Sequence, residues 1–249
     1  MQLAQNWFRD WFNSPYYHQL YHYRDDNEAN KFLNILISHL QAPQNAIMLD
    51  VACGRGRHAK ALAAKGFDVT GIDIAPDSIA FAKQFESDHL HFYVHDMRLP
   101  FWINYYDYAF NFFTSFGYFR TEREHLNAIR TIAGALKENG VFVLDYINVD
   151  HVEKHLVPES KIEIDGVVFN IKRWFDEVHF YKRIMIEDSN INEHCEYTER
   201  IAKILPENFS VMFEKYGLHI QEMFGDYDLH EFDKKNSPRL IMVAKKMID

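Results

Sequence analysis

The chain has 249 residues, of which 47% are hydrophobic and 25% charged, and its formal net charge is −9 at pH 7. This length fits one domain with an added element. An acidic chain without a run of Lys and Arg argues against a nucleic-acid partner, because phosphate binding depends on clustered basic side chains. No stretch approaches 18 apolar residues, and the first twelve residues lack the apolar core of a signal peptide, so no membrane contact is expected.

The cysteines and histidines indicate neither a disulfide framework nor a metal site. Two cysteines, Cys53 and Cys195, are too few for such a framework, and a reducing cytoplasm is the expected location. Among the 14 histidines, His18/His22 and His151/His155 have i, i+4 spacing, but neither pair belongs to an HExxH motif. No cysteine or acid cluster completes a metal-ligand set, so we predict no metal.

Helices and strands are predicted to alternate up to residue 147, after an aromatic start. Residues 1–26 are rich in Trp, Phe and Tyr without a clear period, so we expect an irregular segment that covers the site. Apolar spacing and stop signals such as Pro43 and Gly66 define the elements that follow. These are helices over 27–40, 57–65, 76–86 and 121–137, and strands over 46–51, 67–73, 90–95, 106–113 and 141–147.

This alternation predicts a mostly parallel sheet with helices on both faces, and right-handed crossovers make it doubly wound. The pattern then changes, and residues 149–205 are expected to form a small antiparallel β insertion. Its β-rich segments are 161–164, 167–174, 178–186 and 193–202.

The last part of the chain returns to the main fold. A helix is predicted over 206–216, and strands over 218–224 and 239–245 are expected to pair antiparallel. We therefore expect an α/β, seven-stranded, Rossmann-like domain formed by residues 27–148 and 206–249.

The segment from Ile47 to Ile74 predicts a nucleoside site. An apolar strand ends in Asp50, a turn with Gly54 and Gly56 opens a helix, and a second apolar strand ends in Asp73. Glycines let a ligand approach the backbone, and the helix N-terminus attracts anionic groups. An acid about 20 residues after the first glycine can accept hydrogen bonds from both ribose hydroxyls.

Two cofactor classes fit this unit. Gly54, Gly56 and Ala59 match the G-x-G-x-x-[G/A] dinucleotide fingerprint. With Asp50 before the turn, the same stretch resembles motif I of class I S-adenosylmethionine-dependent methyltransferases. A pyrophosphate gains nothing from a carboxylate at that position, whereas an ammonium or sulfonium ligand does, so Asp50 favours S-adenosylmethionine over a dinucleotide.

The resemblance to class I methyltransferases covers nearly the full chain and is strongest over 46–147. Motif I corresponds to Asp50-Val51-Ala52-Cys53-Gly54-Arg55-Gly56, with Ala52 where the family more often has Gly. Motifs II, III and IV correspond to Gly71-Ile72-Asp73-Ile74, His95-Asp96-Met97 and Asn111-Phe112-Phe113-Thr114-Ser115-Phe116.

The resemblance also implies roles for these residues. Asp73 would accept from the ribose hydroxyls, Ile74 would pack on adenine, Asp96 would accept from the adenine amino group and Met97 would donate its backbone N–H. From the residues themselves, Arg57 is a candidate for the methionine carboxylate, with a surface-charge role as the alternative. Tyr21 or Arg24 is a candidate to close over the cofactor, with a surface ion pair between Arg24 and Glu28 as the alternative. The residues expected to bind the cofactor are Asp50, Ala52, Gly54, Gly56, Arg57, Asp73, Ile74, Asp96, Met97, Asn111, Phe112, Tyr21 and Arg24.

More narrowly, segments 16–25, 111–119 and 224–246 resemble a bacterial small-molecule-type subgroup with a β insertion over the active site. Sugar N-methyltransferases and glycine N-methyltransferase are similar in plan. The residues expected to contact the acceptor are Tyr17, Tyr118, Tyr146 and Arg239.

The predicted function is methyl transfer from S-adenosylmethionine to a nitrogen or oxygen atom of a small molecule. A protein methyltransferase and a non-catalytic S-adenosylmethionine-binding module remain as alternatives. In-line displacement requires no acid–base residue, so no catalytic base is assigned. The segment Asn111-Phe112-Phe113-Thr114 replaces the (Asn/Asp)-Pro-Pro-(Phe/Tyr) turn of nucleobase amino-methyltransferases, which argues against a flipped base as substrate. The sequence indicates no oligomeric state.

Overall fold

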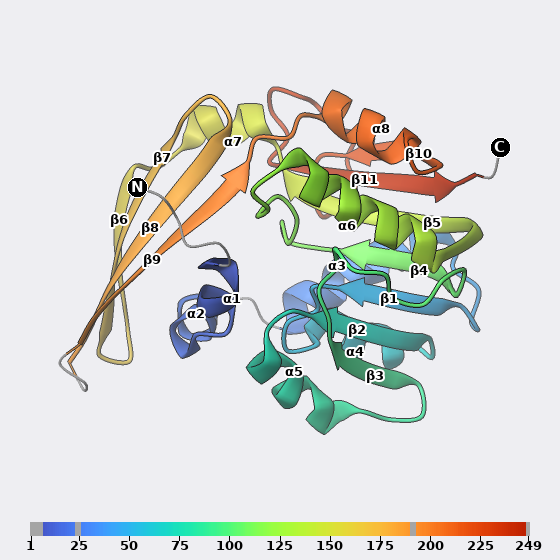
Figure 1. Ribbon diagram of the computed structural model, residues 1–249, viewed down its shortest axis with the longest axis horizontal. Helices are drawn as coiled ribbons and strands as arrows, with labels where there is room; N and C mark the ends of the chain where they lie inside the picture. The colour runs from blue at the N-terminus through green and yellow to red at the C-terminus, as the bar shows by residue number, and fades with distance from the viewer. Residues whose placement is uncertain (1–6, 23–25, 190–192, 248–249) are drawn as a thin grey trace.

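The computed structural model describes residues 7–22, 26–189 and 193–247, which form two β-sheets with helices packed around them (Figure 1). The larger sheet, sheet A, has seven strands in the order β10-β11-β5-β4-β1-β2-β3. They are β1 (Ile47–Val51), β2 (Asp68–Asp73), β3 (Leu90–Val94), β4 (Tyr106–Asn111), β5 (Leu136–Ile147), β10 (Leu218–Phe224) and β11 (Arg239–Lys246).

Sheet A confirms the predicted fold class. Strand β1 pairs in parallel with β2 and β4, and β2–β3 and β4–β5 are parallel as well. Strand β11 runs antiparallel to both β5 and β10, as predicted for the C-terminal pair. The parallel strands therefore end at one edge of the sheet, where open α/β sheets bind ligands.

Helices cover both faces of sheet A, which makes the sheet doubly wound. On one face Phe32 and Ile79 lie in the same buried cluster, and on the other Ile129 and Phe209 share a second one. The first face carries α3 (Asp26–Leu40), α4 (Arg57–Ala63) and α5 (Pro76–Ala82) with the 3₁₀ turn Lys83–Phe85, and the second carries α6 (Glu122–Ala135) and α8 (Pro206–Glu214).

The second sheet, sheet B, is an antiparallel meander in the order β6-β7-β8-β9. It stands beside sheet A, and two short N-terminal helices lie between the sheets (Figure 1). Trp7 and Trp11 of these helices are buried in one cluster with Phe169 and Ile184 of sheet B. The elements are α1 (Trp7–Phe12), α2 (Pro15–Leu20), α7 (Val149–His155), β6 (Glu159–Ile164), β7 (Val167–Phe175), β8 (His179–Asp188) and β9 (Glu193–Ala202).

Three local predictions were incomplete or wrong. The described part of the N-terminal segment is helical rather than irregular, because Ser14 caps α2 and Pro15 occupies its first turn. Helix α7 was not predicted. Helix α6 ends at Ala135, two residues before its predicted end, because Leu136 already pairs with Tyr106 of β4.

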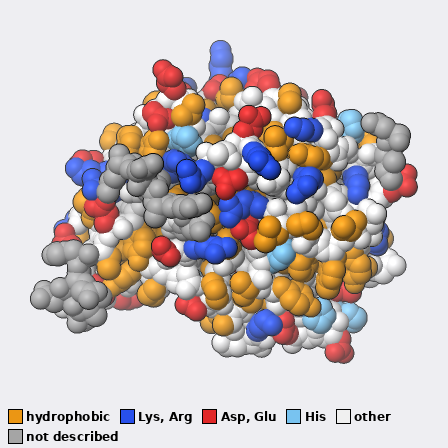
Figure 2. Space-filling model, in the orientation of Figure 1, with side chains coloured by type: hydrophobic (Ala, Val, Ile, Leu, Met, Phe, Trp, Pro, Cys, Tyr) orange, Lys and Arg blue, Asp and Glu red, His pale blue; other side chains and the backbone are white. Residues whose placement is uncertain are grey.

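The surface shows no large patch of one charge sign in the view of Figure 2, where Lys and Arg side chains stand among Asp and Glu side chains. Within the described ranges, no helix is long and apolar enough to cross a membrane.

Gly117 is expected to tolerate no side chain. Its φ is +95°, and a Cβ there would collide with the hydroxyl of Tyr146. Gly117→Ala should therefore lower the free energy of unfolding by about 2–4 kcal/mol, the sum of a left-handed backbone and an overpacked core. Gly134→Ala is the matched control, because a Cβ at this helical position meets nothing within 4 Å; it should stabilise by about 0.5–1 kcal/mol. Urea unfolding measures the change in the free energy of unfolding for both variants. Equal changes in the two variants would contradict the packing argument.

Candidate functional site

A cavity of about 780 Å³ opens at the carboxyl edge of sheet A. Its floor comes from the ends of β1, β2, β3 and β4, and its cover comes from α1, α2 and strand β9 of sheet B. The volume lies within the range of pockets that hold small ligands, about 300–1,000 Å³. The predicted residues that line this cavity are Tyr17, Tyr21, Asp50, Ala52, Gly54, Arg57, Asp73, Ile74, Asp96, Met97, Phe112, Tyr118 and Arg239.

The turn after β1 winds through the left-handed region of the backbone three times. Ala52, Gly54 and Gly56 have φ of 61°, 56° and 80°. A Cβ on Gly54 would meet nothing within 4 Å, whereas one on Gly56 would lie 2.5 Å from the ring of Phe92. Gly54 thus faces open space on the cavity wall, while Gly56 does not line the cavity and instead admits close packing beneath the turn.

Ala52 has a conformation that costs an L-residue roughly 1–2 kcal/mol. Glycine removes this strain but increases the conformational entropy of the unfolded chain, which offsets part of the gain. Ala52→Gly should therefore raise the free energy of unfolding by about 0.5–1 kcal/mol. Ala64→Gly is the control, because exposed Ala64 has right-handed angles (φ −61°, ψ −18°) and should only lose stability. Urea unfolding at pH 7 compares them; destabilisation by both would contradict the strain argument.

Asp50 is a buried carboxylate at the end of β1, with 1% of its surface exposed. One oxygen, Oδ2, accepts from the backbone N–H of Ala59, 3.1 Å away, at the start of α4. Burial raises the pKa of Asp50 to about 7, and the negative charge of Asp73 adds to the rise; the Ala59 amide and the charge of Arg57 oppose it. A positively charged ligand group beside Asp50 would favour its ionised form.

The raised pKa of Asp50 has a consequence for stability. Between its ordinary pKa near 3.8 and about 7 the folded state retains a proton that the unfolded state releases, so the contribution of this group to stability falls as pH rises through that window. Asp50→Asn cannot titrate. Without ligand, the melting temperature of the variant minus that of the wild type should therefore increase from pH 4.5 to pH 8. A difference that stays constant over this range would contradict a buried, titrating Asp50.

Asp73 holds the ligand-facing turn together. Its Oδ2 accepts from Gly54 N–H and its Oδ1 from Ala75 N–H, both at 2.8 Å. Burial raises the pKa of Asp73, against the opposing effect of these backbone hydrogen bonds. Each carboxylate oxygen has a second lone-pair site, so the group can still accept from two hydroxyls.

The donor set around this turn fits S-adenosylmethionine. Among the described residues, no Lys or Arg nitrogen lies within 4 Å of the carboxylates of Asp50 or Asp73, although both line the cavity. A sulfonium or ammonium group would balance the first, and vicinal ribose hydroxyls would donate to the second. The described residues contain no group of three or more His, Cys, Asp or Glu side chains placed to hold a metal.

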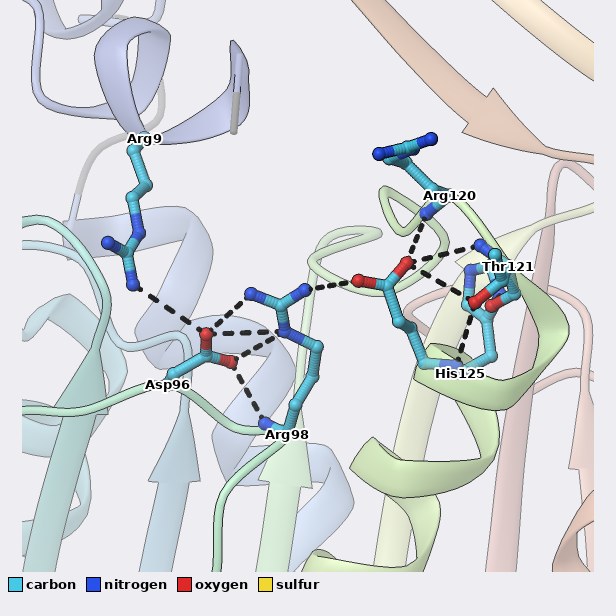
Figure 3. Close-up of polar contacts among 7 residues, drawn as sticks. Arg9, Asp96, Arg98, Arg120, Thr121 and His125 are labelled. Atoms are coloured by element: carbon cyan, nitrogen blue, oxygen red, sulfur yellow. Dashed lines mark hydrogen bonds and ion pairs between the residues drawn. The ribbon is translucent and has the colours of Figure 1, made fainter. Parts of the chain in front are cut away.

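Asp96 has a stronger partner than the sequence indicated. The side chain of Arg98 donates to both oxygens of Asp96 at 2.7–3.2 Å, and its Nη1 donates to Glu124 at 2.7 Å (Figure 3). Arg9 of α1 approaches the same carboxylate at 3.8 Å. Burial alone would raise the pKa of Asp96, but the hydrogen bonds and charge of Arg98 together with the charge of Arg9 lower it.

This network connects the loop after β3 to the start of α6. Glu124 also accepts from the N–H groups of Arg120 and Thr121, and with Thr121 it completes the predicted capping box (Figure 3). Most of the acceptor capacity of Asp96 is therefore used within the protein. The backbone of Met97 and the ring of Phe8 lie at the same end of the cavity.

An ion pair organises the other end of the cavity. Arg239 Nε donates to Oδ1 of fully buried Asp145 at 2.8 Å, and its Nη2 donates to Thr114 at 2.8 Å. The second oxygen of Asp145 accepts from Phe113 N–H at 2.7 Å and from the Tyr227 hydroxyl at 3.1 Å. These bonds hold the loop after β4 at the cavity wall.

Sheet B contributes an acid that the sequence analysis missed. Glu199 lines the cavity, is 6% exposed, and accepts from Trp11 Nε1 at 2.7 Å and from the Tyr21 hydroxyl at 3.0 Å. Lys182 Nζ lies 3.9 Å from its other oxygen. A signal was present, since Glu199 is the charged member of an otherwise apolar alternation, Cys195, Tyr197, Glu199 and Ile201.

Besides Gly56, two predicted site residues do not line the cavity. Tyr146 is fully buried and donates to Ala202 O at 2.6 Å, because its side chain points to the opposite face of β5 from that of Asp145. Asn111 is also fully buried and donates its amide to Val51 O at 2.9 Å, so it ties β4 to β1. Arg24 lies outside the described residues.

Comparison with known proteins gives a family match for the part of the chain that contributes most of the cavity floor. Residues 48–140 match a protein family described as a methyltransferase domain. The chain is 31% identical over 106 residues to a Bacillus subtilis (strain 168) protein with the provisional name methyltransferase YqeM. That match spans 41% of this chain and 43% of the relative, less than half of its length.

Two solved structures share the fold over nearly the whole chain. An S-adenosylmethionine-dependent methyltransferase from Clostridium acetobutylicum ATCC 824 has a TM-score of 0.78, with 94% of this chain and 97% of that chain covered at 17% identity. The sugar N-methyltransferase KedS8 from Streptoalloteichus sp ATCC 53650 has a TM-score of 0.73, with 93% of each chain covered at 18% identity. Identities this low establish the fold alone.

Proposed function

We propose that the protein transfers the methyl group of S-adenosylmethionine to a nitrogen or oxygen atom of a small molecule, and the match of residues 48–140 to a methyltransferase domain supports this. The single observation that carries this proposal is the pair of buried carboxylates, Asp50 and Asp73, on either side of a glycine turn in the cavity. A cationic nucleoside with free ribose hydroxyls matches this pair, whereas a pyrophosphate does not.

The residues of the turn and its neighbours would divide the cofactor between them. Asp73 would accept from the ribose hydroxyls, Ile74 and Met97 would enclose the adenine ring, and Asp50 would face the positive charge. Arg57, which lies 4.8 Å over the ring of Phe113, is within the same cavity and would bind the methionine carboxylate. The bound cofactor supplies an electrophilic methyl group, and these residues orient it and exclude water.

A small acceptor is supported by the cover over the cavity. The cover consists of α1, α2 and β9, and the cavity of about 780 Å³ beneath it would hold a compact molecule beside the cofactor. A net charge of −9 disfavours a nucleic-acid acceptor, as do the interspersed charges on the face shown in Figure 2. We further propose a cytoplasmic location, which the free thiols of Cys53 and Cys195 support.

Replacement of Asp73 tests the cofactor assignment. Asp73→Asn should weaken binding of S-adenosylhomocysteine at least tenfold, because an amide cannot accept from two backbone N–H groups and two hydroxyls at once. Asp68→Asn, at the amino end of the same strand and away from the cavity, is the matched control and should bind as the wild type does. Isothermal titration calorimetry measures both, and circular dichroism checks that each variant is folded.

Thermal unfolding of the wild type is a second test, with NADH as the control ligand. The wild type should be stabilised against heat by S-adenosylhomocysteine, by about 2.7 kcal/mol at 100 times its dissociation constant, and not by NADH. Stabilisation by NADH alone would overturn the proposal in favour of a dehydrogenase. Unchanged S-adenosylhomocysteine affinity in a folded Asp73→Asn variant would refute the assignment of this residue.

A further inference from the structure

Glu199 is a buried acid of strand β9 that lines the cavity, and only one of its two carboxylate oxygens accepts hydrogen bonds from described residues. Its Oε1 accepts from both Trp11 Nε1, at 2.7 Å, and the Tyr21 hydroxyl, at 3.0 Å. Its Oε2 lies 3.9 Å from Lys182 Nζ, beyond hydrogen-bond distance, and no other described residue donates to it. A carboxylate that is 6% exposed and lines a cavity is expected to have donors on both oxygens.

Lys182 forms a long ion pair with Glu199 but gives its short hydrogen bond to the Tyr21 hydroxyl. Its Nζ lies 2.5 Å from the Tyr21 hydroxyl and 4.6 Å over the Tyr21 ring. The other arginines of the cavity have partners of their own: Arg239 pairs with Asp145, Arg57 lies over Phe113 and Arg55 lies over Phe81. Oε2 of Glu199, on a side chain that lines the cavity, thus has no hydrogen-bond donor among the described residues.

Aromatic rings surround this part of the cavity. Phe12 lies 5.2 Å from Tyr17 and 5.1 Å from Tyr118 between ring centroids, and Tyr17 lies 4.9 Å from Tyr21. All four rings line the same cavity as Glu199. The faces of aromatic rings attract cations, and a desolvated cation–π contact contributes about 2 kcal/mol or more. A buried carboxylate with rings beside it is the chemistry that recognises an ammonium group.

We propose that Glu199 and these rings bind the protonated amino group of the methyl acceptor, which makes the acceptor a basic amine rather than an alcohol. The nitrogen takes the methyl group only after it has lost one proton, for which Oε2 of Glu199 is the nearby acceptor. The inference rests on the proposed function, and it names the substrate class and the residue that selects it. Hydrogen bonds between charged groups are roughly twice as strong as those between neutral ones. An alcohol of the same shape would bring no positive charge to Glu199 beyond the long ion pair with Lys182, and a site built for one polar group rejects its isostere.

The test compares amines with the alcohols of the same shape on the protein saturated with S-adenosylhomocysteine at pH 7.5. The probes are glucosamine and glucose, 2-phenylethylamine and 2-phenylethanol, tyramine and tyrosol, and putrescine and 1,4-butanediol. Calorimetry should give at least one amine an affinity tenfold or more above that of its alcohol partner.

Glu199→Gln should abolish this preference while leaving the affinity for S-adenosylhomocysteine unchanged. Glutamine has the same shape and keeps an acceptor oxygen for Trp11 and Tyr21, so the cover stays attached. Glu196→Gln is the matched control, because this residue of the same strand pairs with Arg183 on the opposite face and does not line the cavity. It should keep the wild-type preference.

The outcomes separate this inference from the proposed function. If S-adenosylhomocysteine binds but no amine exceeds its alcohol partner, or if the preference survives Glu199→Gln, the inference is wrong and Glu199 only attaches the cover. Failure of the wild type to bind S-adenosylhomocysteine refutes the proposed function instead.

Discussion

Two acids buried at the ends of neighbouring parallel strands are the constraint on which this site depends. Burial disfavours the ionised form of Asp50 and Asp73 and raises the pKa of both. Asp73 is nevertheless needed as an acceptor, because the amides of Gly54 and Ala75 have it as their partner. The fold thus maintains a costly electrostatic arrangement that a ligand with positive charge and hydroxyl donors would relieve.

The cover over the cavity depends on long-range contacts. Helices α1 and α2 have six residues each, too few to be stable in isolation, and they bury Trp11 and Leu20 against the inner face of sheet B. The bond from Trp11 to Glu199 joins segments 188 residues apart in the sequence. The cover of the cavity therefore forms only when the N-terminal helices and sheet B are folded together.

Sequence reasoning succeeded where the physics is local. The alternation of strands and helices predicted the class of sheet A, and the period-two pattern predicted the four strands of sheet B, because burial of one face repeats with the geometry of the element. The capping box at Thr121 and Glu124 was likewise readable from four residues. Sequence reasoning failed for α1 and α2. Their aromatic rings are buried against sheet B and do not follow a helical period in the sequence.

The sequence by itself determined the glycine turn, the two acids at the strand ends and the methyltransferase resemblance, since each lies within a short stretch whose local geometry dictates its chemistry. Only the tertiary structure decided which side chains meet in the cavity. The side chain of Tyr146 lies in the core because strand residues alternate between faces. Arg98 donates hydrogen bonds to the carboxylate of Asp96. Glu199 entered the cavity from a sheet that the sequence could place only as an insertion. Contacts of this kind depend on the relative position of distant elements, which no local pattern encodes.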